Sequence, residues 1–143
     1  MNISVRSARK EDIPALTALE KECFSSPWSE DSFVSFMDNG CSHCIVAEVG
    51  GKIVGYVGMN LILGEGEITN LAVTASHRRM GIGAMLMERL MNTDLLERIM
   101  LDVRISNTSA IALYEKLGFT VDGTRKGFYQ KPKEDAILMS RNI

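Results

Sequence analysis

Apolar and polar residues alternate along several short segments of the chain, which is the pattern of β-strands with one buried face. Residues 44–49 and 52–63 are two such segments, and Gly50-Gly51 lies between them. Two glycines between two strand-like runs predict a β-hairpin. We therefore expect a sheet of about six to seven strands. The segments are residues 3–8, 44–49, 52–63, 67–73, 99–105, 119–123 and 134–140.

Four other segments repeat apolar residues every three or four positions, as on the buried side of a helix. Each begins beside a residue type that can cap a helix, and the last reaches Gly118, a residue type favoured just after a helix. The expected helices run from Asp12 to about Phe24, from Ser29 to about Met37, from Gly81 to about Met91 and from Asn107 to Gly118.

The order of these elements is strand, two helices, three strands, helix, strand, helix and two strands. The chain has 143 residues, which is the size of one domain, and it contains no repeat or low-complexity tract. The sequence therefore predicts a single α/β (α+β) domain over residues 1–143. Its central sheet is expected to be mixed, mostly antiparallel, and flanked by about four helices.

Composition narrows the class of protein. The formal net charge of −2 gives no overall positive field for nucleic acid, and no apolar run is long enough to span a membrane. The N-terminal residues lack the apolar core of a secretion signal, and three cysteines are too few for a disulfide framework. We expect a cytoplasmic protein, a monomer or a weak homodimer, that binds neither nucleic acid nor membrane.

Cys41 and Cys44 have the C-x-x-C spacing found in some metal and redox sites. A structural zinc ion needs four ligands, and no second ligand pair follows in the chain. We therefore expect no metal site.

Residues 78–84, RRMGIGA, carry the clearest candidate chemistry, because they join a strand-like run to a helix-like run. A helix N-terminus has unpaired backbone N–H groups and the positive end of the helix dipole, and both bind phosphate. Gly81 and Gly83 let a diphosphate approach these N–H groups, and Arg78 and Arg79 add charged donors. The alternative is a solvated basic turn whose glycines only shape the chain.

Two common phosphate-binding motifs do not fit this loop. The Walker pattern GxxxxGK[ST] is absent from the chain. A Rossmann fingerprint needs a third glycine, and Leu86 stands at that position.

The loop resembles the Q/R-x-x-G-x-G/A diphosphate loop of the GNAT acetyltransferases, which bind acetyl-CoA. EITNLAV at residues 67–73 resembles the splayed central strand of that family, and NTSAIALYEKLGF at residues 107–119 resembles its asparagine-to-tyrosine helix. FSSPWSEDSF, LDVRISN and GFYQKPKEDAILM are similar to the RimI branch, the ribosomal-protein-alanine N-acetyltransferases. The resemblance covers nearly the whole chain, with the motifs in family order.

The resemblance implies that acetyl-CoA is the cosubstrate. Its contacts would come from the backbone of the splayed strand, from the diphosphate loop, and from an asparagine that caps the following helix and meets the pantetheine arm or the diphosphate. These residues are Leu71, Ala72, Val73, Arg78, Arg79, Met80, Gly81, Ile82, Gly83, Ala84 and Asn107.

The resemblance also implies two catalytic residues. Asp102 stands where the RimI branch has a glutamate base, and because aspartate is one methylene shorter it would act directly or through a water. The alternative for Asp102 is an ordinary ion pair with Arg104, which shares its face of the strand. Tyr114 stands at the position of the family's general acid, and its alternative is packing within an apolar helical stripe.

The acceptor groove of the family lies between the first inter-helix loop and the last hairpin. Trp28 and Tyr129 fall in these two segments, so each is a candidate wall for an acceptor peptide or, alternatively, a core residue. Glu134 and Asp135 could attract a cationic N-terminus or simply end a turn.

The activity implied is transfer of an acetyl group from acetyl-CoA to an amine by direct attack on the thioester. An α-amine, with a pKa near ~8, is easier to deprotonate than a lysine near ~10.4. The acceptor expected is the N-terminal alanine of a ribosomal protein. Two alternatives stay open: another acceptor, such as a protein lysine or a small-molecule amine, and a catalytically silent acyl-CoA-binding module.

Overall fold

The computed structural model describes residues 2–143 and contains seven strands in a single sheet. Four α-helices and two short 3-10 helices connect the strands in the order that the sequence predicts. The strands are β1 (Ile3–Ser7), β2 (Ser42–Val49), β3 (Lys52–Ile62), β4 (Glu65–Val73), β5 (Arg98–Arg104), β6 (Thr120–Gln130) and β7 (Lys133–Asn142). The helices are α1 (Ile13–Cys23), α2 (Glu30–Asp38), α3 (Ile82–Met91) and α4 (Thr108–Lys116), with η1 (Lys10–Asp12) and η2 (Ala75–His77).

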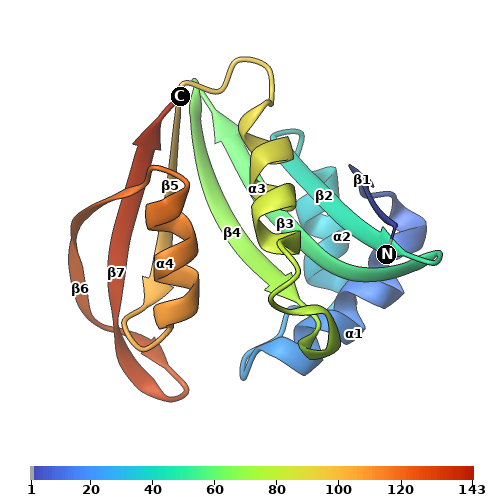
Figure 1. The fold of residues 1–143 in the computed structure, drawn as a ribbon, viewed down its shortest axis with the longest axis horizontal. Helices are drawn as coiled ribbons and strands as arrows, with labels where there is room; N and C mark the ends of the chain where they lie inside the picture. Colours follow the sequence, from blue (N-terminus) through green and yellow to red (C-terminus); the bar gives the residue numbers. More distant parts are fainter. Residues whose placement is uncertain (1) are drawn as a thin grey trace.

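The strand order in the sheet is β1-β2-β3-β4-β5-β7-β6. Every neighbouring pair is antiparallel except β4 and β5, which are parallel, so the prediction of a mixed and mostly antiparallel sheet is confirmed. The parallel pair needs a crossover connection, and α3, which follows β4 in the chain and precedes β5, supplies it. This helix packs over the part of the sheet formed by β1, β2, β3 and β4. Figure 1 shows α3 and α4 on one face of the sheet and α1 and α2 on the other.

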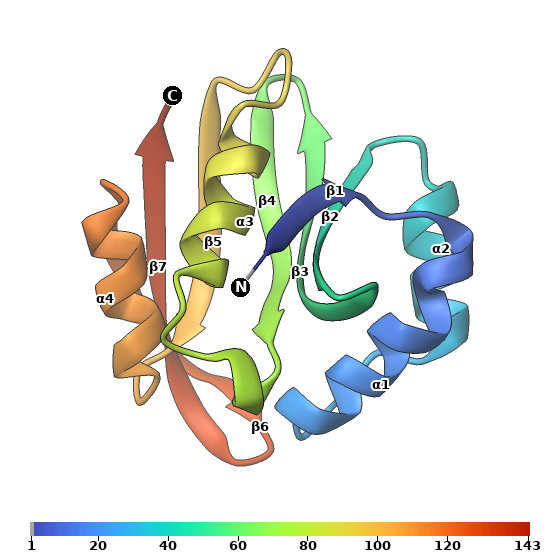
Figure 2. The ribbon, with the colours of Figure 1, turned by 45° about the vertical axis from the view of Figure 1, so that its right-hand side comes forward.

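Two apolar clusters hold the helices on their respective faces. The cluster under α3 and α4 is the larger, and it includes Leu86, Leu90 and Tyr114 together with strand residues such as Ile99 and Met139. The cluster under α1 and α2 covers only the half of the sheet formed by β2, β3 and β4. On the α1 and α2 side, no helix within residues 2–143 lies over the face of β5, β7 and β6 (Figure 2).

The feature that creates the site is the divergence of β4 from β5. Their parallel ladder pairs only Glu65–Glu67 with Arg98–Met100, and beyond it the two strands separate. A register shift in the β3–β4 ladder places Thr69 as an extra residue of β4, between Ile68 and Asn70. Such a bulge bends its strand and changes the direction of the neighbouring side chains, and this one lies just beyond Glu67, the last residue of β4 in the ladder with β5.

Most of the predicted helix boundaries are confirmed by their caps. The Ser29 hydroxyl accepts from the Ser32 backbone N–H, and the Asn107 side chain accepts from the Ala110 N–H at 3.2 Å. Gly118 follows α4 with φ of +90°, the left-handed region that glycine enters without strain.

Asp12 precedes α1 as predicted, but its side chain does not cap that helix. Its carboxylate binds the Arg6 guanidinium at 2.8 and 2.9 Å and accepts the Arg9 backbone N–H. A charged partner on β1 outcompetes the neutral N–H groups of the helix end for the same oxygens.

No helix within residues 2–143 has the length and apolarity needed to cross a bilayer.

Candidate active site

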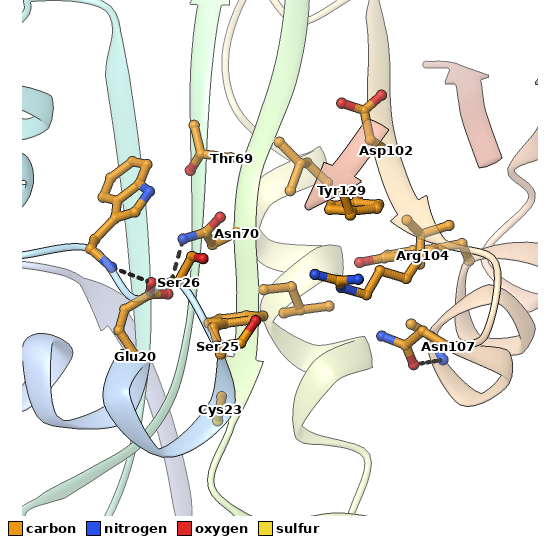
Figure 3. Close-up of a pocket in the computed structure, with 17 residues that line it drawn as sticks. Glu20, Cys23, Ser25, Ser26, Thr69, Asn70, Asp102, Arg104, Asn107 and Tyr129 are labelled. Carbon is orange, nitrogen blue, oxygen red and sulfur yellow. Dashed lines mark hydrogen bonds between the residues drawn. The ribbon is translucent and has the colours of Figure 1, made fainter. Parts of the chain in front are cut away.

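A cavity of about 490 Å³ occupies the gap between β4 and β5. Its walls come from the end of α1 and the loop after it, from β4, from β5, from the start of α4 and from the β6–β7 hairpin (Figure 3). These segments are far apart in the sequence and converge only because the sheet splits. The cavity includes six residues predicted from the sequence: Trp28, Leu71, Asp102, Asn107, Tyr114 and Tyr129.

The predicted diphosphate loop lies outside this cavity, at the N-terminus of α3. The first hydrogen bond of that helix joins the Met85 N–H to the Gly81 carbonyl, so the N–H groups of Ile82, Gly83 and Ala84 have no partner within the helix. Gly81 has a φ of +78°, which starts the helix sharply after the loop. The geometry therefore matches that of an anion cradle.

The two arginines of this loop differ in their surroundings. Arg78 donates from Nε to the Val73 carbonyl at 3.1 Å and so ties the loop to the end of β4. Arg79 is exposed, and its φ is +64°. Arg78 thus has a structural contact in addition to its charge.

Gly83 has a second reason to be glycine that the sequence does not reveal. A Cβ added there would lie 3.1 Å from the Leu113 side chain of α4. The residue therefore permits the close approach of α3 and α4 as well as access to the helix N-terminus.

Asp102 projects from β5 toward the cavity, and its side chain is exposed. The alternative reading of Asp102 as the ion-pair partner of Arg104 is wrong. Arg104 binds Glu134 at 3.1 Å and the carbonyls of Lys131 and Pro132. The hairpin satisfies the guanidinium, and the Asp102 carboxylate remains available at the cavity.

Tyr114 lies on α4, and its buried side chain packs against Phe119. The residue is also part of the cavity lining. Burial raises the pKa of the Tyr114 hydroxyl, with a smaller contribution from Tyr129. The hydroxyl is therefore protonated throughout the neutral range. The packing role and the cavity role are both present, since the ring is buried while the residue lines the cavity.

The β6–β7 hairpin forms one wall of the cavity and is held by the end of β5. The Arg104 guanidinium lies over the Tyr129 ring at 4.3 Å from its centroid, which is cation–π distance. Glu134 accepts from the Ser106 backbone N–H and from Arg104, and these hydrogen bonds, that of Ser106 first, hold the pKa of the carboxyl below its usual range. Glu134 thus anchors the hairpin. The two roles suggested from the sequence were attraction of a cationic N-terminus and the end of a turn.

The opposite wall is the loop between α1 and α2. Trp28 packs against Phe33 and Phe36, with ring centroids at 5.2 and 5.4 Å, and also lines the cavity. The Ser25 hydroxyl of the same loop donates to the Lys131 carbonyl of the hairpin. A hydrogen bond therefore joins the two walls that the family resemblance assigns to an acceptor.

A model of the acetyltransferase (GNAT) family matches residues 13–119. The chain belongs to this family.

Relatives in the GNAT family resemble this chain over almost its full length. The ribosomal protein bS18-alanine N-acetyltransferase of Escherichia coli (strain K12) is 33% identical over 147 residues, covering 98% of this chain and 97% of the relative. An N-alpha-acetyltransferase of Saccharolobus solfataricus is 32% identical over 158 residues, covering 99% and 94%. The crystal structure of the ribosomal-protein-S18-alanine N-acetyltransferase from Escherichia coli has a TM-score of 0.91 and 32% identity, covering 99% of this chain and 94% of that chain.

Asn107 caps α4 and also lines the cavity. Its amide oxygen caps α4, which leaves its amide nitrogen facing the cavity (Figure 3). A side-chain donor is thus fixed at the cavity by the same hydrogen bond that begins the helix.

Sequence reasoning missed Glu20, a carboxylate at the cavity with no solvent exposure. A signal for it exists in the sequence. Glu20 falls on the apolar face of α1 with Leu16 and Leu19, and a charged residue on a buried helix face requires partners. Those partners come from β3, β4 and the α1–α2 loop, and no local pattern identifies them.

Proposed function

We propose that this GNAT acetyltransferase transfers the acetyl group of acetyl-CoA to the α-amino group of a protein N-terminus, an alanine at the start of a ribosomal protein. One observation carries the proposal. A cavity with an available carboxylate, Asp102, and a buried tyrosine, Tyr114, opens between two walls that suit an extended peptide. The full-length similarity to a ribosomal protein bS18-alanine N-acetyltransferase supports the same acceptor.

The cosubstrate would bind along the side of the cavity nearest to α3 and α4. The free N–H groups at residues 82–84 and the exposed Arg79 suit the diphosphate. Beyond Glu67, β4 has no ladder with β5, so the backbone of Leu71, Ala72 and Val73 suits the pantetheine arm and the thioester oxygen. The amide nitrogen of Asn107 adds a donor on the other side.

The acceptor amine must lose a proton to attack the thioester carbon. Asp102 would take that proton, directly or through a water, because its carboxylate has no ion pair within residues 2–143 and its side chain reaches solvent. As the carbon–nitrogen bond forms and the carbon–sulfur bond breaks, the sulfur leaves with a negative charge.

Tyr114 would stabilise that departing sulfur. A phenol, with an ordinary pKa near ~10, is already a weaker acid than a thiol near ~8.5, and burial raises the pKa of the Tyr114 hydroxyl further. The role best matched to this chemistry is a hydrogen bond to the leaving thiolate, with the final proton drawn from solvent.

The test is acetylation of a peptide that begins with alanine. Thiol release from acetyl-CoA is followed together with the mass of the peptide. One matched control has the same peptide with its α-amine blocked, and a second has a blocked N-terminus and an internal lysine. We expect acetylation only of the free α-amine. Acetylation of the lysine peptide alone, or cosubstrate binding without transfer to any amine, would contradict the proposal.

A further inference from the structure

Glu20 is completely buried and accepts hydrogen bonds from three separate elements. Its Oε2 accepts from the Tyr56 hydroxyl of β3 at 2.5 Å and from Asn70 Nδ2 of β4 at 2.9 Å. Its Oε1 accepts from the Trp28 backbone N–H at 2.9 Å. A carboxylate surrounded by three donors acts only as an acceptor, so each partner is forced to present a donor.

This constraint fixes the side-chain amide of Asn70. A side-chain amide can flip by about 180°, which exchanges the positions of its oxygen and its NH2 group. Its hydrogen bonds determine which of the two orientations it adopts. Glu20 demands the NH2 group, so Asn70 Oδ1 must point away from Glu20, as Figure 3 shows. Asn70 lines the cavity, and its Oδ1 makes no hydrogen bond to any residue from 2 to 143. A fixed acceptor therefore faces the site.

The position of this acceptor relates it to the reaction. Asn70 directly follows the bulge at Thr69 and directly precedes Leu71 on the strand assigned to the thioester. Asp102 faces the same cavity from β5, on the other side of the split. A protonated amine between the two strands has three N–H groups. One proton can leave toward Asp102 while another N–H stays bound to Asn70, which keeps the amine bound at the site as it becomes neutral.

We infer that Asn70 Oδ1 binds the acceptor amine, and that Glu20 is the positioning residue that holds Asn70 in the orientation required. The inference rests on the proposed function, because it assigns a residue to the acceptor of that reaction. It also gives the buried carboxylate a role in binding without contact between Glu20 and the substrate.

Two single variants test the inference. Asn70→Ala removes the acceptor, and we expect the peptide KM to rise roughly tenfold, with kcat within about threefold and acetyl-CoA affinity unchanged. Glu20→Gln can still accept from the Trp28 N–H through its oxygen, but it then turns an NH2 group toward Asn70. The Asn70 amide would then flip, so that its oxygen accepts from that NH2 group and its own NH2 group faces the acceptor amine. The peptide KM of Glu20→Gln should therefore rise at least as much as that of Asn70→Ala.

The double variant tests the coupling between the two residues. If Glu20 acts through Asn70, then Glu20→Gln combined with Asn70→Ala should be no worse than Asn70→Ala alone. The chain has one tryptophan, Trp28, so its fluorescence spectrum reports whether the loop keeps its place in each variant. Tyr56→Phe is the control for stability, because it removes another donor from Glu20 and lies outside the cavity lining. It should lower the melting temperature without moving the peptide KM.

The outcomes separate cleanly. A peptide KM unchanged in Asn70→Ala overturns the assignment of Asn70. Fully additive effects in the double variant, with Trp28 fluorescence unchanged, overturn the role of Glu20. If Asn70→Ala does not fold, Glu20→Gln tests the amide orientation by itself, and a native peptide KM there counts against the inference. A native protein that binds acetyl-CoA but acetylates no amine overturns the proposed function, and the inference with it.

Discussion

The two sides of the cavity are built in opposite ways. The side assigned to acetyl-CoA is made of residues close together in the chain: the end of β4, the loop 78–84 and the start of α3. The side assigned to the acceptor joins the α1–α2 loop to the β6–β7 hairpin, more than a hundred residues away. Ser25 meets Lys131 there, and Arg104 meets Glu134.

This difference explains why the acetyl-CoA side could be predicted from the sequence and the acceptor side could not. A helix N-terminus makes an anion site from its own backbone, so a short motif is enough to encode it. A peptide groove needs side chains held at fixed distances by partners from other elements. Mutations should accordingly separate the two sides, with acceptor-side changes altering the peptide KM and cosubstrate-side changes altering acetyl-CoA affinity.

The largest effect is expected at Asp102, which lies between the two sides. Asp102→Asn keeps the size of the residue and removes its charge, so kcat should fall by roughly 10²–10⁴-fold as the amine loses its base. The deficit should shrink at high pH, where an amine with a pKa near ~8 is already neutral. Steady-state rates between pH 6 and 10 measure both effects. Asp102→Glu, which restores the residue of the RimI branch, serves as the active control.

The next effect is expected on the acceptor side alone. Arg104→Met removes the ion pair with Glu134 and the packing over Tyr129, which frees the hairpin. With the hairpin wall less firmly held, kcat/KM for the peptide should fall roughly 30-fold, because misplacing a bound substrate by about 1 Å can cost about 100-fold in rate. Acetyl-CoA affinity, measured by titration, should stay native. Arg125→Met is the matched control, since Arg125 lies on the same hairpin over Phe128.

The pH dependence of this anchor has a definite sign. The pKa of Glu134 is lowered in the folded protein by Ser106 and Arg104. Its contribution is therefore fully present above the ordinary glutamate pKa near ~4.3 and is lost as the pH falls through the lowered value. Peptide affinity in the neutral range should not follow the titration of Glu134. A loss of affinity centred near pH 6 in the native protein, absent from Glu134→Gln, would contradict this.

A smaller effect is expected at Tyr114. Tyr114→Phe keeps the buried ring beside Phe119 and removes only the hydroxyl. The kcat should fall roughly tenfold while both KM values stay near native, because the hydroxyl acts on the leaving sulfur in the transition state. The measurement is steady-state kinetics beside a thermal melt. An unchanged kcat would assign Tyr114 to packing alone.

The smallest effect is expected on the cosubstrate side. Arg79→Asn removes an exposed charge while keeping a residue type that tolerates a positive φ. Acetyl-CoA affinity should weaken about threefold to fivefold, and less at high salt, with the peptide KM unchanged. Lys52→Asn removes an exposed charge at the start of β3 and is the control. Equal losses in the two variants would mean that the effect is one of net charge.

Several parts of the fold could be predicted because each depends on neighbours in the chain. The alternation around Gly50-Gly51 gave the β2–β3 hairpin, and the caps at Ser29 and Asn107 gave the starts of α2 and α4. The glycine-rich loop at the start of α3 belongs with these, since its N–H groups are free whatever the rest of the chain does. The relation to GNAT acetyltransferases also followed from such contiguous segments.

The remaining parts depended on which strands pair and where they part. From the sequence alone, Asp102 was the only candidate partner of Arg104. The insertion of β7 beside β5 brings Glu134 to the guanidinium instead. In the sequence, Glu20 is a single charged residue on a predicted helix. In the structure, α1 packs against β3 and β4, and Glu20 is buried among three hydrogen-bond donors. Hydrogen bonds within a turn or a cap are encoded by residues a few positions apart. The cavity exists because the half of the sheet formed by β1 to β4 and the half formed by β5, β7 and β6 share only a short parallel ladder. Residues far apart in the sequence form that ladder, so the packing of the whole sheet decides where it ends.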